Sequence, residues 1–352
     1  MLLVGVIGWG VLVGSVAGVL IHRDQAAAAA RAPLPALHVR LLRRDVWAYH
    51  HFPAYRTPIP VLGYHGIGSQ RNYLTVTRKL FSQQMAALHL GGFHTISIAT
   101  YARYLEGKAV KLPSRPILLT FDDGRIDSYR GADRVLARYH YQATMFVVAA
   151  WVSEHPGFAL HWDELAAMQG SGRWSIQEHA GREHTRYRTD AKGDLGEAYA
   201  YRRWIPGPNG GGQKESFAAY KRRVTGDIAW GEAQLRAHIP GYRPYAFAVP
   251  YSNYGQRRTN DPRIPRFFLA MLHRHFPVVF DGDYLDEGAS RPQEPKGRTP
   301  PGLSYRITMG PQVGAATLDC RLYDFTAVLA MWREYSCIQP GPIGEAPRDS
   351  ED

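Results

Sequence analysis

The chain has little cysteine, no long run of basic residues and a shortage of acidic charge, and each shortage excludes something. Cys320 and Cys337 are its only two cysteines, which excludes a disulfide-dense scaffold and a zinc site built on four thiolates. The two thiols would pair outside the cytoplasm and stay reduced inside it, and the sequence leaves both outcomes open. No repeat with a period of about 20–50 residues occurs, so a solenoid or a propeller is not expected.

Acidic residues are outnumbered, with 31 Asp and Glu against 42 Lys and Arg, and the formal net charge is +11. A positive balance suits nucleic acid, anionic lipid or an acidic cell-wall polymer. Because the basic residues are scattered and no zinc-finger or aromatic RNA-binding motif occurs, we expect no nucleic-acid partner. A solvated cationic surface is the simplest interpretation. Hydrophobic residues make up 45% of the chain, which excludes wholesale disorder and permits a large core.

An uncharged apolar segment covers residues 2–21. A helix of this length would be ~30 Å long, enough to cross a bilayer. We therefore predict a transmembrane signal anchor over residues 1–22, with a cleaved signal peptide as the alternative. The orientation is ambiguous, because Arg23 and Arg31 follow the segment and no Lys or Arg precedes it. The positive-inside rule would then keep the body of the chain in the cytoplasm.

The rest of the chain divides into an Ala-, Pro- and Arg-rich stalk over residues 23–57, a large domain over 58–337 and a flexible tail over 338–352. Within the domain, near-continuous apolar strands such as 117–121 alternate with predicted helices such as 217–238. This alternation is typical of a parallel sheet covered by helices, and so of an α/β fold. Residues 186–215 are predicted as an inserted loop, which either covers a substrate groove or is idle surface.

Polar residues follow four of the predicted strands, at the ends where ligand chemistry occurs in parallel α/β folds. They are His65, the pair Asp122 and Asp123, the pair His179 and His184, and the pair Pro250 and Tyr251. Because the carboxyl ends of parallel strands meet at one edge, we expect these residues to converge. Four such clusters predict a site more strongly than any one of them does.

Adjacent carboxylates and a histidine pair together indicate a metal site. Side chains alternate along an extended strand, so one of Asp122 and Asp123 can bind a metal while the other faces a water. Two imidazoles and one carboxylate leave coordination positions open for water and substrate. Each pattern alone has a plainer alternative: a tight turn for Asp-Asp-Gly, and exposed loop positions for His179 and His184. We expect one divalent metal ion, Zn²⁺ by default, although Fe²⁺, Co²⁺ or Ni²⁺ suits the same ligands.

These clusters resemble the motifs of a known family, the NodB-like polysaccharide deacetylases of carbohydrate esterase family 4. Residues 119–124, Leu-Thr-Phe-Asp-Asp-Gly, look like its first motif, and residues 247–251, Phe-Ala-Val-Pro-Tyr, look like its third. His179 and His184 resemble its second motif at a wider spacing, which is similar to the poly-β-1,6-N-acetylglucosamine deacetylase branch. Residues 61–65, Val-Leu-Gly-Tyr-His, are also similar to that branch.

The resemblance covers about residues 58–310 and implies a distorted (β/α) barrel with fewer than eight strands and a metal-dependent amide hydrolase. It implies that three residues hold the metal: Asp123, His179 and His184. Asp122 would be the general base that deprotonates the attacking water. The backbone N–H of Tyr251 would stabilise the oxyanion, and the side chains of Tyr251 and Pro250 would contact the sugar.

Three positions depart from the family pattern. Ala248 stands where the third motif often has an arginine that partners the base, and Ser252 replaces its glycine. The usual late Leu-x-His, the source of the general acid, is not evident. His65 is therefore the predicted general acid, with a buried structural histidine as the alternative. Arg306 is expected at the surface, and orientation of a carboxylate is the alternative for it.

The sequence thus predicts a metal-dependent deacetylase that hydrolyses the N-acetyl group of N-acetylhexosamine units in an extracellular or cell-wall polysaccharide. We expect it at the cell membrane with the catalytic domain outside the cytoplasm, or secreted. One alternative is a non-hydrolytic glycan-binding module on the same fold, which the departures at Ala248 and the late histidine favour. The other is a cytoplasmic metal-dependent hydrolase of a small N-acyl compound, which the charges flanking the apolar segment favour. The polymer and the oligomeric state stay open.

Overall fold

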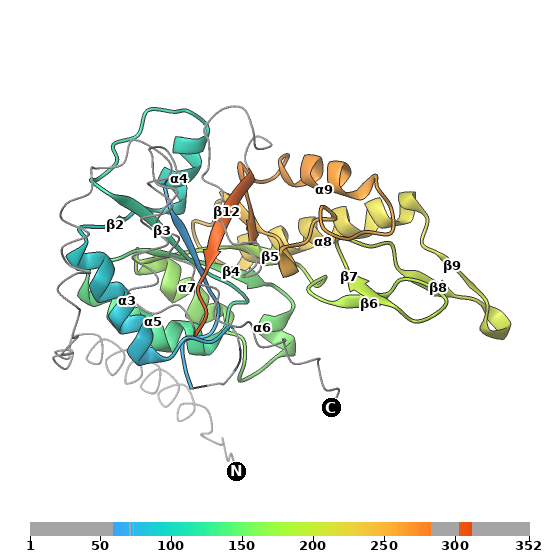
Figure 1. Ribbon diagram of the computed structural model, residues 1–352, viewed down its shortest axis with the longest axis horizontal. Coiled ribbons are helices and arrows are strands. Elements are labelled where there is room, and N and C mark those ends of the chain that lie inside the picture. The colour runs from blue at the N-terminus through green and yellow to red at the C-terminus, as the bar shows by residue number, and fades with distance from the viewer. Residues whose placement is uncertain (1–58, 70–71, 73, 283–302, 312–352) are drawn as a thin grey trace, which may run out of the picture. The chain divides into compact units, whose positions relative to one another are not determined.

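The computed structural model describes residues 59–69, 72, 74–282 and 303–311 (Figure 1). The predicted anchor or signal peptide at 1–22, the stalk at 23–57, the tail at 338–352 and both cysteines lie outside the described residues. Within the described ranges, no helix has the length and hydropathy needed to cross a bilayer.

Seven parallel strands form a closed barrel. They are β1 (Val61–Tyr64), β3 (Pro116–Phe121), β4 (Ala143–Val148), β5 (Trp174–Ala180), β10 (Ala246–Ala248), β11 (Val278–Gly282) and β12 (Leu303–Thr308). The ring closes because β1 pairs with β3 on one side and with β12 on the other. The short strand β2 (His94–Thr95) pairs with β3 at the edge of the sheet and is not part of the ring. The predicted α/β barrel with fewer than eight strands is confirmed.

The barrel strands are buried on both faces, which explains why they read as continuous apolar runs. Every residue of β3 and β4 is buried. Successive side chains point to opposite sides of a strand. Leu118 and Phe146 accordingly belong to the cluster that fills the barrel. Their neighbours Leu119 and Met145 belong to the cluster that packs beneath the outer helices.

Helices pack around the outside of the barrel strands (Figure 1). They are α3 (Arg78–Leu90), α4 (Ile98–Leu105), α5 (Ile126–Arg138), α6 (Trp151–Glu154), α7 (Trp162–Gly170), α8 (Phe217–His238) and α9 (Ile264–Leu272). Tyr101 of α4 stacks on Phe280 inside the barrel, and its hydroxyl hydrogen-bonds the hydroxyl of Ser304 at 2.9 Å. Because α4 packs near the start of β12, the carboxyl ends of the strands at the opposite rim are available for a site.

The predicted inserted loop contains two antiparallel hairpins. Strand β6 (Arg186–Arg188) pairs with β7 (Leu195–Glu197), and β8 (Trp204–Pro206) pairs with β9 (Gly212–Lys214). Figure 1 shows both hairpins on the side of the barrel that carries α8. A strand of three residues offers too few positions for a period-two pattern, so the sequence indicated only a loop there. The helix predicted after it, at 217–238, is α8.

Candidate active site

The carboxyl rim of the barrel brings the predicted polar residues together. Asp122 and Asp123 follow β3, His179 lies near the end of β5, and His65 follows β1. The Nε2 atom of His65 lies 3.8 Å from Oδ2 of Asp122, and Nε2 of His179 lies 4.0 Å from the same oxygen. His184 reaches the group from the loop after β5, with its Nε2 atom 3.5 Å from Oδ1 of Asp123.

Three of these residues form a cluster that fits a metal ion. The ligand atoms of Asp123, His179 and His184 all lie within 4.8 Å of one another. Nε2 of His179 is 3.6 Å and Nε2 of His184 is 3.5 Å from Oδ1 of Asp123, which is too long for a good hydrogen bond. Two ligands at about 2.0–2.2 Å from one tetrahedral ion are themselves about 3.3–3.5 Å apart. The spacing therefore suits an ion between the three side chains.

The protonation of the two imidazoles also suits metal binding. Nδ1 of His179 lies 2.6 Å from the carbonyl oxygen of Ala248, and a proton on Nδ1 leaves the Nε2 lone pair for a metal. Burial lowers the pKa of His179 and of His184 to about 4, against the opposing pull of the nearby carboxylates. Both rings are therefore neutral at neutral pH, as a metal ligand must be.

The turn after β3 separates the two neighbouring carboxylates. Asp123 has φ of 73° and Gly124 has φ of 65°, both in the left-handed region. Asp is one of the few residues other than glycine that adopts this region readily. A Cβ atom on Gly124 would also lie 3.3 Å from the side chain of Val147. The turn thus directs Asp123 toward the two histidines, while Asp122 stays inside the barrel.

Arg306 holds Asp122 through two parallel hydrogen bonds. Its Nη1 and Nη2 atoms donate to Oδ1 and Oδ2 of Asp122 at 2.6 and 2.7 Å. The expectation that Arg306 is a surface residue is wrong: it is 4% exposed and lies on β12 beside β1. Burial alone would raise the pKa of Asp122, but Arg306, followed by His179 and His65, holds it well below its usual range. The guanidinium missing at Ala248 is thus supplied by another strand.

His65 lies beside this pair, on a segment that packs closely against α5. The Ser128 hydroxyl of α5 donates a short hydrogen bond to the carbonyl oxygen of His65. A Cβ atom on Gly131 of α5 would lie only 2.2 Å from the carbonyl oxygen of Ile67. The His65 side chain is 19% exposed, so it contacts the Asp122 carboxylate on one side and is open to solvent on the other. Its Nδ1 atom has no hydrogen-bond partner among the described residues.

Aromatic side chains flank His184. Its ring centroid lies 4.7 Å from that of Trp151 and 4.7 Å from that of Tyr251. Tyr251 belongs to the short 3₁₀ helix η2 (Pro250–Ser252), and the guanidinium of Arg186 lies 5.2 Å from its ring centroid. Trp151 and Arg186 were not predicted as site residues. Trp151 is the first residue of α6 and Arg186 is the first residue of β6.

The backbone of η2 is strained at the position where Ser252 departs from the family pattern. Tyr251 has φ of 55° and Ser252 has φ of 50°, a region where glycine is at ease and other residues are strained. The family glycine that Ser252 replaces would suit this conformation. Strain of this kind often accompanies a functional site. Because η2 directly follows β10, Pro250 and Tyr251 lie at the rim.

Comparisons with known proteins agree with this geometry. Residues 109–261 match the family model of polysaccharide deacetylases. The chain is 37% identical over 90 residues, 26% of its own length, to YxkH of Bacillus subtilis, named as a candidate polysaccharide deacetylase. It is 22% identical over 228 residues, 60% of its length, to poly-β-1,6-N-acetyl-D-glucosamine N-deacetylase of Escherichia coli. In each case the chain spans about a third of the relative, 32% of its length.

Solved structures show the same fold. A de-N-acetylase from Aggregatibacter actinomycetemcomitans superposes with a TM-score of 0.60 and 20% identity. The match covers 76% of this chain and 99% of that one. The barrel, its rim and the family match lead to one conclusion: residues 109–261 of this chain are similar to the polysaccharide deacetylase domain, and the described barrel shares its fold with a solved de-N-acetylase.

Proposed function

We propose that the chain is a metal-dependent deacetylase that hydrolyses the N-acetyl group of N-acetylhexosamine units in an extracellular or cell-wall polysaccharide. One observation carries the proposal: the Asp123, His179 and His184 cluster lies next to a carboxylate that Arg306 keeps ionised. Similarity to the Escherichia coli poly-β-1,6-N-acetyl-D-glucosamine N-deacetylase supports an N-acetylglucosamine polymer as substrate. The net charge of +11 favours an acidic envelope polymer as the surroundings of the chain.

Asp123, His179 and His184 would hold the metal, and two nitrogens with one oxygen favour Zn²⁺, while Fe²⁺, Co²⁺ and Ni²⁺ fit the same set. When bound, a divalent ion polarises the acetamide carbonyl and makes water easier to deprotonate. The two neutral imidazoles need no proton loss before binding at neutral pH. Nδ1 of His179 keeps its proton and donates it in a hydrogen bond to the carbonyl oxygen of Ala248, which keeps the ring oriented.

Asp122 would accept the proton of the attacking water. Arg306 keeps this carboxyl ionised and directed at the rim, so an acceptor is present at every physiological pH. A carboxylate with so low a pKa is a weak base, so proton removal by Asp122 would depend on the acidity that a bound divalent ion gives to water. His65, 3.8 Å from Asp122, would donate a proton to the departing amine nitrogen.

Tyr251 and Pro250 would complete the substrate side of the site. The backbone N–H of Tyr251 is the proposed donor to the oxyanion, an interaction worth about 3 kcal/mol in enzymes that have one. The Tyr251 ring, with the guanidinium of Arg186 beside it, would contact the sugar. The catalytic domain would lie outside the cytoplasm, anchored by the segment at 1–22 or secreted.

The non-hydrolytic alternative loses much of its support. It rested on Ala248 and on the missing late histidine, and Arg306 and His65 now stand beside Asp122 in their place. The cytoplasmic alternative, a hydrolase of small N-acyl compounds, depends on the orientation of the amino-terminal segment. A reporter enzyme fused to the carboxyl end of the whole chain distinguishes the two compartments.

Acetate release tests the proposed reaction. The purified chain, loaded with Zn²⁺, is incubated with β-1,6-linked N-acetylglucosamine oligomers and, separately, with small N-acyl amino acids. We expect acetate from the oligomers alone, and none after dialysis against a chelator. Binding of oligomers without acetate release would establish the glycan-binding alternative, and release from the small compounds alone would establish the cytoplasmic one.

A further inference from the structure

The turn that joins the two proposed histidine ligands is held by the carboxylate of Asp227 on α8. The backbone N–H groups of Gly181, Arg182 and Glu183 donate to this carboxylate at 3.0, 2.7 and 3.4 Å. The Tyr199 hydroxyl donates to its Oδ2 atom at 2.5 Å. Three successive N–H groups thus converge on one acceptor, and Asp227 is only 7% exposed.

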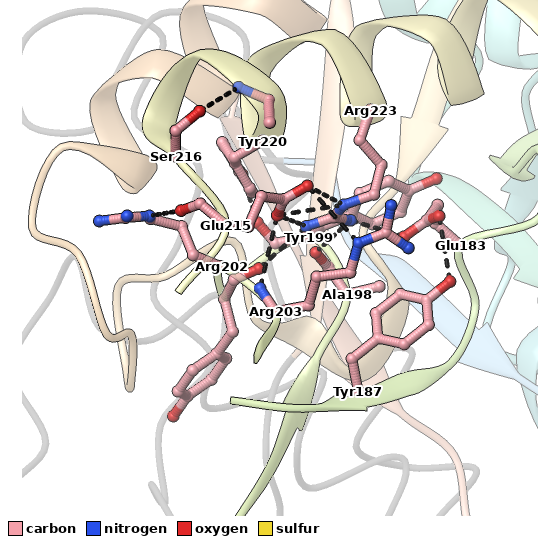
Figure 2. Close-up of polar contacts among 12 residues, drawn as sticks. Glu183, Tyr187, Ala198, Tyr199, Arg202, Arg203, Glu215, Ser216, Tyr220 and Arg223 are labelled. Carbon is pink, nitrogen blue, oxygen red and sulfur yellow. Dashed lines mark hydrogen bonds and ion pairs between the residues drawn. The ribbon is translucent and has the colours of Figure 1, made fainter. Parts of the chain in front are cut away.

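Arg223 lies four residues before Asp227 on α8. It also holds the loop between the two histidines, through the side chain of Glu183. Figure 2 shows its guanidinium between Glu183 and Glu215, with donor distances of 2.6 and 2.9 Å. It also donates to the carbonyl oxygens of Ala198 and Tyr201 at 3.0 and 3.1 Å. Residues four apart share one face of a helix, so α8 presents a cation and an anion to one loop. The hairpin insertion and the ligand turn are thereby joined through Arg223.

The contact between the turn and α8 leaves no room for displacement. A Cβ atom on Gly181 would lie 2.4 Å from the carbonyl oxygen of Asp227 and 2.7 Å from its Oδ1 atom. A Cβ atom on Gly231 of α8 would lie 3.0 Å from the Cα atom of Gly181. The turn therefore lies directly on the helix backbone, and its position follows that of α8.

This support matters because the turn is wide and has few polar side chains that could hold it in place. Four residues separate His179 from His184, and the first two, Ala180 and Gly181, have no polar side chain. His179 is fixed by β5 and by its bond to Ala248. His184 lies beyond the strand, directly after Glu183, so its distance from Asp123 depends on how the turn is held.

We propose that Asp227 is a positioning residue for His184, and that it sets the affinity of the metal site by fixing the backbone of residues 181–183. The inference rests on the proposed function, because it concerns the metal that the proposed reaction uses. Asp227 does not touch the ion or the substrate. Removal of groups that orient metal ligands typically costs about 10–100-fold in metal affinity.

The test measures metal binding to the full chain, independently of catalysis. Asp227→Asn keeps the shape of the side chain but turns an amide group toward the N–H donors. Val224→Ala is the matched control, because Val224 is fully buried on the same helix and packs in the hydrophobic cluster. Zn²⁺ affinity is measured by competition with a chromophoric chelator, the Co²⁺ absorption spectrum reports the ligand geometry, and thermal unfolding is followed without metal.

We expect Asp227→Asn to raise the Zn²⁺ dissociation constant at least about 10-fold and to change the Co²⁺ spectrum. Val224→Ala should lower the unfolding temperature of the metal-free chain and leave the dissociation constant within about twofold, since it removes packing alone. Equal metal affinity in wild type and Asp227→Asn overturns the positioning role. So does an affinity loss in Val224→Ala as large as that in Asp227→Asn, because general destabilisation would then explain both.

Gly181→Ala provides a second route if Asp227→Asn does not yield folded protein. The added methyl group pushes the turn off α8 and leaves the Asp227 side chain unchanged, so the same loss of affinity is expected. A folded Gly181→Ala chain with wild-type affinity overturns the inference. A wild-type chain that binds no metal overturns both this inference and the proposed function. If the wild type binds metal and the variants bind it with the same affinity, this inference alone is overturned.

Discussion

Two neighbouring aspartates at the end of β3 have different surroundings, and their proposed roles differ for that reason. Asp122 lies in the fork of Arg306 and is ionised, while Asp123 turns through a left-handed backbone toward two neutral imidazoles. Sites commonly divide acid, base and ligand roles by giving similar side chains different neighbours. The sequence motif Asp-Asp-Gly cannot show which carboxylate meets which partner.

Asp122→Asn and Asp123→Asn form a matched pair that separates these roles. We expect Asp122→Asn to keep its metal and to lose about 10²–10⁴-fold in kcat, the usual contribution of a general base. Asp123→Asn should lose both the metal and the activity. Elemental analysis of the purified chains and acetate release together make the measurement. An Asp122→Asn chain with full activity would show that the base lies elsewhere.

Removing Arg306 should cost stability as well as activity. Arg306→Gln leaves the Asp122 carboxylate buried without its main partner, which typically costs about 3–5 kcal/mol. The double variant Asp122→Asn with Arg306→Gln carries no charge at either position, so it should be less destabilised than Arg306→Gln alone. Denaturant unfolding of the metal-free chains measures both. A double variant that is the less stable of the two contradicts the buried ion pair.

The two buried imidazoles predict how stability depends on pH. The pKa of His179 and of His184 is about 4 in the folded chain, against about 6.5 for an unfolded histidine. As the pH falls from about 6.5 to about 4, the unfolded chain binds protons that the folded chain does not, so the free energy of unfolding falls. Denaturant unfolding of the metal-free protein measures the profile.

The controls for that profile are two sets of variants. The double variant His179→Gln with His184→Gln should show a flatter dependence in this pH range. His89→Gln, at an exposed position of α3, should keep the wild-type profile. A wild-type stability that does not change between pH 6.5 and pH 4.5 would contradict the low pKa values of the two site histidines.

At the scale of elements, some segments were predictable and others were not, for physical reasons. The helix at 217–238 was predicted with its observed bounds, because a long helix repeats its apolar pattern several times. Strand β12 was not recognised. Its inward residues Ser304 and Arg306 are polar, and they are acceptable only because Tyr101 and Asp122 bond them from distant segments. Such partners become visible only once the barrel closes.

Two glycines in helices should respond to alanine with opposite signs. Gly131 of α5 faces the Ile67 backbone, where a Cβ atom would lie 2.2 Å from an oxygen, while Gly226 of α8 has nothing within 4 Å. Gly226→Ala should raise the free energy of unfolding by about 0.5–1 kcal/mol through helix propensity. Gly131→Ala should lower it and reduce activity, because it displaces the segment that carries His65. Denaturant unfolding and acetate release measure the two effects.

If Gly131→Ala is as stable and as active as the wild type, the close packing of the His65 segment on α5 is not needed by the site. A stability loss in Gly226→Ala would show that helix propensity is not the deciding factor on α8. The comparison therefore separates backbone entropy, which both variants share, from the close approach that only Gly131 makes.

At the scale of the whole molecule, the barrel turns distant motifs into one site. Seven parallel strands present their carboxyl ends at one rim, so residues as far apart in the sequence as His65 and Arg306 meet Asp122. The convergence of the motif residues was predictable, because parallel topology implies it. The source of the guanidinium was not, because a lone arginine late in the chain carries no signal of its partner.

The most direct test is a titration of the metal-free chain with Zn²⁺ while acetate release from β-1,6-linked N-acetylglucosamine oligomers is followed. The single Asp123, His179 and His184 cluster among the described residues predicts a rate that rises linearly and levels off at one ion per chain. His184→Ala should show no such rise. Full activity before any metal is added, or no activity at any metal level in the wild type, would contradict the account.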